Sequence, residues 1–339
     1  DFFINEYDPE LESEAEKIVE LTNIKGFDVI GLSLMPTDNP STIGVTLAVA
    51  KIIKERTDAT VLVGGSIRMG SEPEKRLIES SYIDYRILGS PSTSSGEWNL
   101  LDFCKKYSTD EEENSRGLVM YKNNEYHANH VEYSDEKRAK VTLPDFEGLP
   151  MNLYRMKNDE SSKNLKNNRG LLVLPFFFVR SCPHNCAFCS NSRVNSWGKE
   201  DPKIVVDKLK ELKEKYNTKY FFFHNTTINP TYKYAERFAE EVIARDLDIK
   251  WSDCANFAPF DRELLKKLKK AGAERLVFGF ESASPNLLRY IKKNYTVEDA
   301  EKTLKICNDL DICVELDMIC GFPYESDLDV EATLNFLKK

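Results

Sequence analysis

Three cysteines close together in the sequence carry the clearest chemistry of this chain. Cys182, Cys186 and Cys189 follow the spacing C-x3-C-x2-C, and the aromatic Phe188 stands directly before the third. Thiolates are soft ligands that hold iron–sulfur clusters, and one tight loop can direct three of them at the same cluster. A four-iron cluster held in this way keeps one iron without a protein ligand. That open iron can take a substrate or a cofactor, whereas a fully ligated cluster mainly carries electrons.

Two other roles for the cysteines fit the sequence less well. A tetrahedral zinc site needs a fourth ligand nearby. His184 lies inside the loop, too close to its cysteine neighbours, and no second C-x2-C pair follows. A disulfide is disfavoured because three is an odd number and no secretory segment is present. The spacing therefore favours an iron–sulfur cluster.

The cysteine spacing and its aromatic residue resemble the signature of the radical S-adenosylmethionine (SAM) enzymes. The resemblance implies that Cys182, Cys186 and Cys189 ligate a [4Fe–4S] cluster and that SAM occupies the open iron. It also implies a reaction: the reduced cluster splits SAM, and the resulting 5′-deoxyadenosyl radical takes hydrogen from an unactivated C–H bond. A one-electron donor such as flavodoxin or ferredoxin is the partner that this chemistry implies.

Alternating strands and helices must position the cysteine loop. The first strand expected, 171–179, is almost entirely apolar, as in a barrel strand that is buried on both faces, and the loop leaves its carboxyl end. Further strands are expected at 220–223, 249–255, 275–280 and 312–319, with helices at 203–216, 232–245, 261–271, from Thr296 and from Asp327. The family's barrel is open and has six such units, so the sixth is expected beyond Lys339.

Active residues of such barrels lie at the carboxyl ends of the strands. The segment 279–282 resembles the family's G-x-E-S motif, which holds the ribose and methionyl parts of SAM, and 321–325 resembles its G-F-P-x-E segment beside the adenine. The family's G-G-E motif is replaced by His224-Asn225-Thr226, which leaves the contact to the SAM amino group open. The SAM contacts expected are Phe188, His224, Asn225, Asn256, Glu281, Ser282, Ile319, Gly321 and Phe322.

The amino-terminal part also alternates strands and helices, which predicts a doubly wound parallel sheet with helices on both faces. Strands are expected at 2–4, 27–34, 60–63 and 85–88, and helices at 10–22, 41–56 and 72–80. Ligands of such sheets bind at the carboxyl ends of the strands, where small residues let a ligand approach the backbone.

This part resembles the cobalamin-binding domain that precedes the barrel in one large class of radical SAM enzymes. Ser33-Leu34 and Gly64-Gly65 carry the resemblance. The cobalamin contacts that it implies are Ser33, Leu34, Thr37, Gly64, Gly65, Gly89 and Ser90. The D-x-H-x-x-G motif that supplies a lower cobalt ligand is not found and would precede Asp1, so that ligand stays open. Without G-x-G-x-x-G a nicotinamide cofactor is disfavoured, but the glycines could also form only tight turns of an empty scaffold.

The fold class expected is therefore α/β, with a cobalamin-binding-like domain at 1–108 and a partial (β/α)6 radical SAM barrel at 169–339. Residues 109–168 are expected to be a linker that contains a β-hairpin at 117–131. Both ends look cut: the first strand of the first domain is expected before Asp1, and the chain is interpreted as a fragment truncated at both ends.

Composition limits the partners and the location. The net charge is −9 and no Lys/Arg-rich run is present, which disfavours nucleic acid. No apolar run approaches the roughly 20 residues that span a bilayer. The remaining cysteines are expected to be buried, reduced thiols, which favours a reducing cytoplasm; they are Cys104, Cys254, Cys307, Cys313 and Cys320.

Several outcomes of radical chemistry stay open. With cobalamin bound, C-methylation of a small-molecule or peptide substrate is favoured; without it, cyclisation, rearrangement or peptide epimerisation is the alternative. Cys254, after the third barrel strand, is a weak candidate for a hydrogen donor, and an ordinary barrel thiol is the simpler interpretation. A non-catalytic cluster or cobalamin sensor is a further alternative, although a sensor needs no SAM-binding strand ends. The sequence does not identify the substrate or the oligomeric state.

Overall fold

The computed structural model describes residues 9–22, 24–34, 40–65, 72–89, 96–129, 141–155, 170–180, 182–189, 198–258 and 260–338. The chain divides into two compact units, Asp1–Ser134 and Asp135–Lys339. The strand expected at 2–4 lies outside the described residues. No helix in the described ranges combines the length and the apolar character that a membrane crossing requires.

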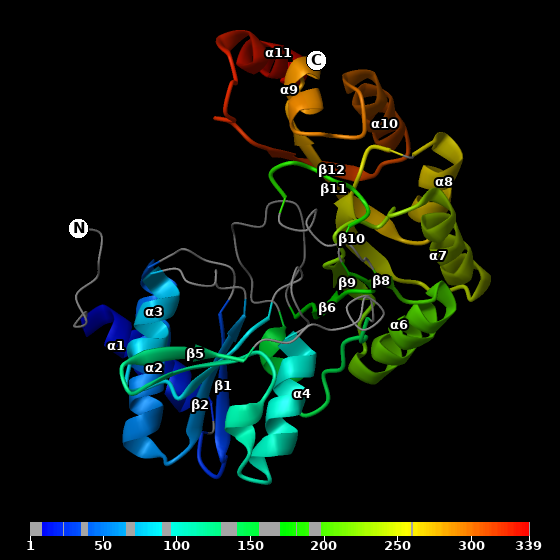
Figure 1. The fold of residues 1–339 in the computed structure, drawn as a ribbon. Coiled ribbons are helices and arrows are strands. Elements are labelled where there is room, and N and C mark those ends of the chain that lie inside the picture. The colour runs from blue at the N-terminus through cyan, green and yellow to red at the C-terminus, as the bar shows by residue number, and fades with distance from the viewer. Residues whose placement is uncertain are drawn as a thin grey trace. The chain divides into compact units, whose positions relative to one another are not determined.

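The first unit contains a five-stranded sheet in the order β1-β2-β3-β4-β5 (Figure 1). The first three strands are parallel and the last two are antiparallel. The strands are β1 (Val29–Leu34), β2 (Thr60–Gly65), β3 (Tyr85–Ile87), β4 (Leu118–Lys122) and β5 (Glu125–Ala128). The helices are α1 (Pro9–Leu21), α2 (Pro40–Arg56), α3 (Glu72–Glu79), α4 (Gly96–Tyr107) and the 3₁₀ helix η1 (Glu112–Asn114).

Alternate residues of β2, the middle one of the three parallel strands, face different helices, as expected for a strand whose side chains point in turn to the two faces. Val61 and Val63 belong to an apolar cluster with α1, α2 and α3. Leu62 belongs to a second cluster, with Phe103 of α4. Helices therefore cover both faces of this sheet, which confirms the doubly wound architecture predicted from the sequence.

The expected hairpin at 117–131 is present as β4 and β5, but it is part of the first sheet. Its turn is made by Asn123 and Asn124, both with positive φ (53° and 62°), a conformation that asparagine tolerates in two-residue hairpin loops. Ile87 of β3 pairs with Leu118 of β4. The predicted linker therefore contains the last two strands of the sheet, because the hairpin pairs with β3 along the edge that the parallel strands leave open.

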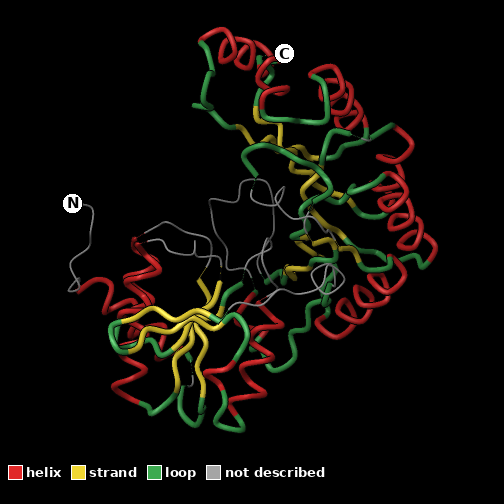
Figure 2. The backbone as a smooth tube through the Cα atoms, viewed as in Figure 1, coloured by secondary structure: helices red, strands yellow, loops and turns green. Residues whose placement is uncertain are grey.

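The second unit contains a parallel five-stranded sheet in the order β6-β9-β10-β11-β12, each neighbour joined through helices that lie along one face (Figures 1 and 2). Its strands are β6 (Val173–Phe176), β9 (Tyr220–Phe223), β10 (Lys250–Ala255), β11 (Ala273–Glu281) and β12 (Cys313–Met318). Its helices are α6 (Pro202–Tyr216), α7 (Tyr232–Ala244), α8 (Arg262–Lys270), α9 (Pro285–Tyr290), α10 (Val297–Asp309), α11 (Asp327–Leu337) and the 3₁₀ helix η2 (Met151–Tyr154).

This arrangement is that of a parallel (β/α) barrel segment. Aromatic side chains fill the layer between strands and helices: Phe223 of β9 stacks on Trp251 of β10 with ring centroids 5.2 Å apart, and Phe178 stacks on Phe238 of α7 at 5.1 Å. Thr296 begins α10 with the predicted capping box, in which its side chain and that of Asp299 bond each other's backbone.

The strand expected at 171–179 is split into β6 and the short β7 (Val179–Arg180), which pairs with β8 (Gly198–Lys199). The reason is a change of hydrogen-bond partner. The backbone N–H groups of Phe178 and Val179 both donate to the side-chain oxygen of Asn225, at 2.8 Å each, instead of to a neighbouring strand. The chain leaves the sheet at this point and continues towards the cysteines.

Candidate active site

The cysteine loop follows β7 and is held by the segment after α9. The backbone N–H of Ala187 donates to the carbonyl of Ile291 at 2.9 Å, and a turn within the loop is closed by Cys189 N–H donating to the carbonyl of Cys186 at 3.1 Å. The side-chain nitrogen of Asn294 lies 3.2 Å from Nδ1 of His184. The loop thus has a defined backbone path beside the barrel edge.

The three thiols are free of disulfides, partly buried and close enough to influence one another. Burial raises the pKa of the Cys182 thiol, and the neighbouring Cys186 and Cys189 raise it further. Burial also raises the pKa of Cys186, whereas the cation of Lys293 lowers it. Iron binding must therefore displace protons from the loop, as is usual for thiolate sites.

The donor set fits a cluster better than a single ion. Among the described residues, no three His, Cys, Asp or Glu side chains are gathered tightly enough for one metal ion. A single zinc ion draws its sulfurs in by bonds of about 2.3 Å. Each cysteine of a cluster binds a different iron, so the three sulfurs of one loop can lie further apart.

Glu281 ends β11 beside this loop, in an unusual backbone conformation. Its φ is +62°, and the register with β12 shifts between Gly279 and Glu281. The carboxylate turns back and forms an ion pair with Lys293 at 3.3 Å, and both side chains are only 7% exposed. A Cβ at Gly279 would lie 2.7 Å from Oε1 of Glu281 and 3.1 Å from Nζ of Lys293, so a larger residue there would require these side chains to shift. Burial raises the pKa of Glu281, an effect that Lys293 partly offsets.

Two aromatic residues connect the cysteine loop to the segment after β12. The ring of Phe188 is 42% exposed and lies 5.6 Å from the ring of Phe322. The N–H of Ile319 donates to the carbonyl of Glu281 at 3.3 Å, and the N–H of Gly321 donates to the carboxylate of Glu325. The structure thus brings together Phe188, Glu281, Ile319, Gly321 and Phe322 at one edge of the sheet.

Asn225 and Ser282 lie at the expected strand ends, but the protein itself uses their polar groups. Asn225 is 3% exposed; besides accepting from residues 178 and 179, its amide donates to Asp253 at 2.7 Å. Ser282 is 1% exposed and its hydroxyl lies 3.0 Å from that of Thr333 in α11. Both side chains join elements of the barrel. Their predicted contact with SAM stays a prediction, although few of their polar atoms are left for it.

His224 and Asn256 follow β9 and β10. The ring of His224 packs edge-on against Phe222 at 4.4 Å, and partial burial lowers its pKa. Asn256 accepts a hydrogen bond from the N–H of Ala258 at 3.0 Å. Because β9, β10 and β11 are adjacent and parallel, these residues share the barrel edge with Glu281.

Cys254 lies on the face of β10 opposite to Trp251 and Asp253, which are buried. Although Cys254 is an exposed residue, partial desolvation of its thiol, and then the nearby carboxylates, raise the pKa of this thiol to about 11, so it is protonated at neutral pH. The prediction that the other cysteines are buried is wrong for most of them: only Cys307 is buried, whereas Cys104, Cys254, Cys313 and Cys320 are exposed. Strand alternation explains Cys254 and Cys313, since each occupies a position that faces away from the helices.

In the first unit, the predicted cobalamin residues that the structure describes meet at the carboxyl edge of the parallel strands. Ser33 pairs with Gly64 and Leu34 with Gly65 across β1 and β2. A Cβ added at Gly64 meets no described atom within 4 Å. At Gly65 the same atom would overlap the carbonyl of Leu34, and φ is +108°. Gly89 follows β3, while Thr37 and Ser90 lie outside the described residues.

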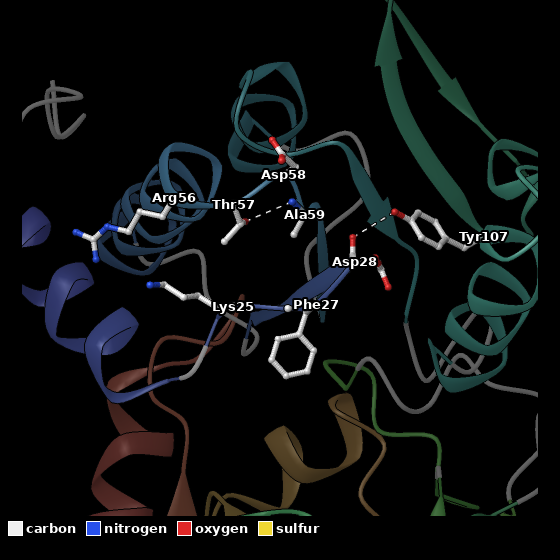
Figure 3. Close-up of a pocket in the computed structure, with 9 residues that line it drawn as sticks. Lys25, Phe27, Asp28, Arg56, Thr57, Asp58, Ala59 and Tyr107 are labelled. Atoms are coloured by element: carbon white, nitrogen blue, oxygen red, sulfur yellow. Dashed lines mark hydrogen bonds between the residues drawn. The ribbon is translucent and has the colours of Figure 1, made fainter.

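A pocket of about 330 Å³ lies at the opposite, amino edge of the same strands (Figure 3). Lys25, Phe27 and Asp28 line it before β1, and Thr57 to Ala59 line it before β2. Its polar groups are engaged locally: Thr57 accepts from the N–H of Ala59 at 3.3 Å, and Tyr107 donates to the carbonyl of Asp28 at 3.2 Å. Parallel sheets bind ligands at the carboxyl edge, so this pocket is not the candidate site.

Residues 176–337 match the family model of the radical SAM superfamily. This chain carries a radical SAM domain. The [4Fe–4S] cluster and SAM are the cofactors of that superfamily. The predicted recognition, fold class and these cofactors are confirmed.

Known proteins resemble this chain along most of its length. An uncharacterized methyltransferase of Pyrococcus horikoshii is 27% identical over 328 residues, which cover 93% of this chain and 65% of the relative. The solved structure of the radical SAM methyltransferase TsrM from Kitasatospora setae, with tryptophan and a SAM analogue, matches with a TM-score of 0.68 at 17% identity. The match covers 97% of this chain and 63% of TsrM.

A second solved structure, the cobalamin-dependent radical SAM enzyme OxsB with aqua-cobalamin and SAM bound, has a TM-score of 0.67 at 19% identity. The match covers 98% of this chain and 46% of OxsB. At these identities the two structures support the fold. The chain spans less than two thirds of the length of each of these three relatives.

Sequence reasoning missed Lys293, a buried cation beside the cysteine loop. Lys292 and Lys293 are adjacent and identical in type, but the backbone of Lys292 has a φ of +58° and its residue is exposed. Only the fold of the turn after α9 decides which of the two points inward. Thr333 of α11 was missed for a similar reason, since its partners Ser282 and Ala283 lie about fifty residues earlier.

Proposed function

We propose that this chain is the cofactor-binding part of a radical SAM enzyme that methylates an unactivated carbon, with cobalamin as the methyl carrier. The observation that carries the proposal is the convergence of the cysteine loop with the segments that follow α9 and β12: the N–H of Ala187 donates to the carbonyl of Ile291, and the ring of Phe188 lies 5.6 Å from that of Phe322. The methyltransferase from Pyrococcus horikoshii, which is similar along most of this chain, supports the methylation outcome.

The residues of the chain have distinct tasks in this proposal. Cys182, Cys186 and Cys189 hold three irons and leave the fourth for SAM. When bound and reduced, the cluster supplies the electron that cleaves SAM and so generates the radical that activates the carbon. Phe188 and Phe322 cover one side of the SAM site with apolar surface, and the exposed backbone turn at Gly321 gives the adenine side close access.

Cobalamin has its proposed place at the carboxyl edge of the first sheet. The support is the register of Ser33 with Gly64 and of Leu34 with Gly65, together with the open space above Gly64. OxsB, whose fold is similar, binds aqua-cobalamin. Small side chains at such an edge allow a large flat ligand to lie against the backbone.

The test is anaerobic reconstitution of the chain with iron and sulfide, followed by dithionite and SAM. Formation of 5′-deoxyadenosine, measured by liquid chromatography and mass spectrometry, is the expected result. The same protein incubated with hydroxocobalamin and desalted should keep a corrin absorption spectrum. A cluster without 5′-deoxyadenosine would favour a sensor, and SAM cleavage without a retained corrin would favour cyclisation, rearrangement or epimerisation over methylation.

A further inference from the structure

A lysine is buried directly beside the cysteine loop, and the cluster-binding role of the loop does not by itself explain it. The side chain of Lys293 is 7% exposed. The segment that carries it is fixed against the loop on both sides, by the bond from Ala187 N–H to Ile291 O and by the contact of Asn294 with His184. The position of this ammonium relative to the cysteines is therefore set by the backbone.

The surroundings of the ammonium are mainly aromatic and contain one carboxylate. Its nitrogen lies 3.3 Å from Glu281 and 5.7 Å from the ring centroids of both Phe188 and Tyr295. Burying a Lys–Glu pair is costly, and the desolvation penalty can exceed the attraction within the pair. A further negative group nearby would offset that penalty, and the three thiolates of a bound cluster are such a group.

Charge near a cluster also changes its reduction. Reduction adds one negative charge, and a fixed cation in a weakly screened site stabilises the reduced form more than the oxidised form. Net charge, hydrogen bonds and solvent exposure are the features by which proteins set cluster potentials. Lys293 supplies the charge, while its ion pair with Glu281 moderates it.

We propose that Lys293 is an electrostatic positioning residue of the radical SAM site, whose ammonium raises the midpoint potential of the cluster and whose distance from it is fixed by Glu281. This inference rests on the proposed function, because it requires the cluster in the cysteine loop. The proposed effect of Lys293 on the cluster potential does not require SAM or substrate to be bound.

The experiment is a mediated redox titration of the anaerobically reconstituted chain without SAM, followed by electron paramagnetic resonance, with iron and sulfide counted for every variant. Lys293→Met should keep the cluster and move its midpoint potential to a more negative value. Lys293→Arg keeps the positive charge, so its midpoint potential should lie close to that of the wild type. Lys292→Met is the matched control, since it removes an exposed charge one residue away, and its potential should equal that of the wild type.

Glu281→Gln removes the carboxylate that moderates Lys293 and should move the potential in the positive direction. Because the loss of this negative charge acts even without Lys293, Lys293→Gln, which removes the positive charge and keeps a polar side chain, decides the question if Lys293→Met holds no cluster. An intact cluster with unchanged potential in Lys293→Met, or a negative shift in Glu281→Gln, overturns the proposal for Lys293 and leaves the proposed function standing. A wild-type chain that assembles no cluster instead overturns the proposed function.

Discussion

The parallel strands of the two sheets end in carboxyl edges of opposite character. The barrel edge in the second unit carries ionisable side chains, among them Cys186, Glu281 and Lys293. The described part of the edge in the first unit pairs Ser33 with Gly64 and Leu34 with Gly65, and leaves backbone accessible. An edge that supplies ligands and charges can be recognised from residue types, whereas an edge that supplies space is recognised by the side chains it lacks.

Removing one thiolate should have the largest effect on this contrast. Cys186→Ala should abolish 5′-deoxyadenosine formation and most of the iron content, because the remaining two cysteines on the loop cannot hold the cluster. The measurement is iron and sulfide per chain after anaerobic reconstitution. Cys320→Ala is the control, as this cysteine is exposed and lies outside the loop. Normal iron content in Cys186→Ala would contradict the assignment of the loop.

The substitution Asn225→Ala tests whether this polar residue at the barrel edge binds SAM or stabilises the fold. Asn225→Ala removes the acceptor of two buried N–H groups and the donor to Asp253. Each unsatisfied buried group costs about 1–3 kcal/mol, so the free energy of unfolding should fall by roughly 3–5 kcal/mol. Hydrogen exchange of the amides of residues 178 and 179 should accelerate. If stability is unchanged and only the affinity for SAM falls, Asn225 is a SAM ligand as the sequence predicted.

Substitutions at Gly64 and Gly65 should distinguish a glycine that the backbone requires from a glycine that leaves room for a ligand. Gly65→Ala should destabilise the first unit by about 1–3 kcal/mol, since its φ of +108° is strained for any side chain and the Cβ overlaps Leu34. Gly64→Val should leave the unfolding free energy unchanged or higher, because valine suits a strand and its Cβ meets open space.

The same variant sharpens the cobalamin proposal. Gly64→Val should reduce the cobalamin that the protein retains about tenfold, measured from the corrin absorption after desalting. Full retention in Gly64→Val, together with the expected loss of stability in Gly65→Ala, would mean that cobalamin does not approach this edge and that the glycines serve only the fold.

The sequence allowed prediction of the features that have a local signal. A run of four aromatic residues placed β9 at 220–223 as the structure has it, and Thr296 with Asp299 indicated the capping box. Features that depend on distant partners were not predictable. The split between β6 and β7 depends on an amide more than forty residues later, and the inward choice of Lys293 over Lys292 depends on the turn after α9. The three cysteines could be recognised from the sequence because they lie on one loop, and their role as cluster ligands stays a prediction.

The smallest effect expected is a change with pH in the stability that a buried carboxyl near the barrel edge contributes. Asp253 lies below the barrel edge, is 1% exposed and accepts hydrogen bonds from Asn225 and from the N–H of Cys254. Burial raises the pKa of this carboxyl well above its ordinary value. A raised pKa in the folded state means that the carboxyl stabilises the fold most below about pH 4, its unfolded pKa, and that this contribution is lost as pH rises through the folded pKa.

The difference in unfolding free energy between the wild type and Asp253→Ala should therefore shrink as pH rises from 5 to 8, measured by urea denaturation of the iron-free chain. Glu315→Ala is the matched control, because that carboxylate is exposed on β12 and its ion pair with Arg275 is only partly buried. Its effect on stability should be small, about 0–1 kcal/mol. A difference for Asp253→Ala that grows with pH would show that the hydrogen bonds from Asn225 and Cys254, rather than burial, control this carboxyl.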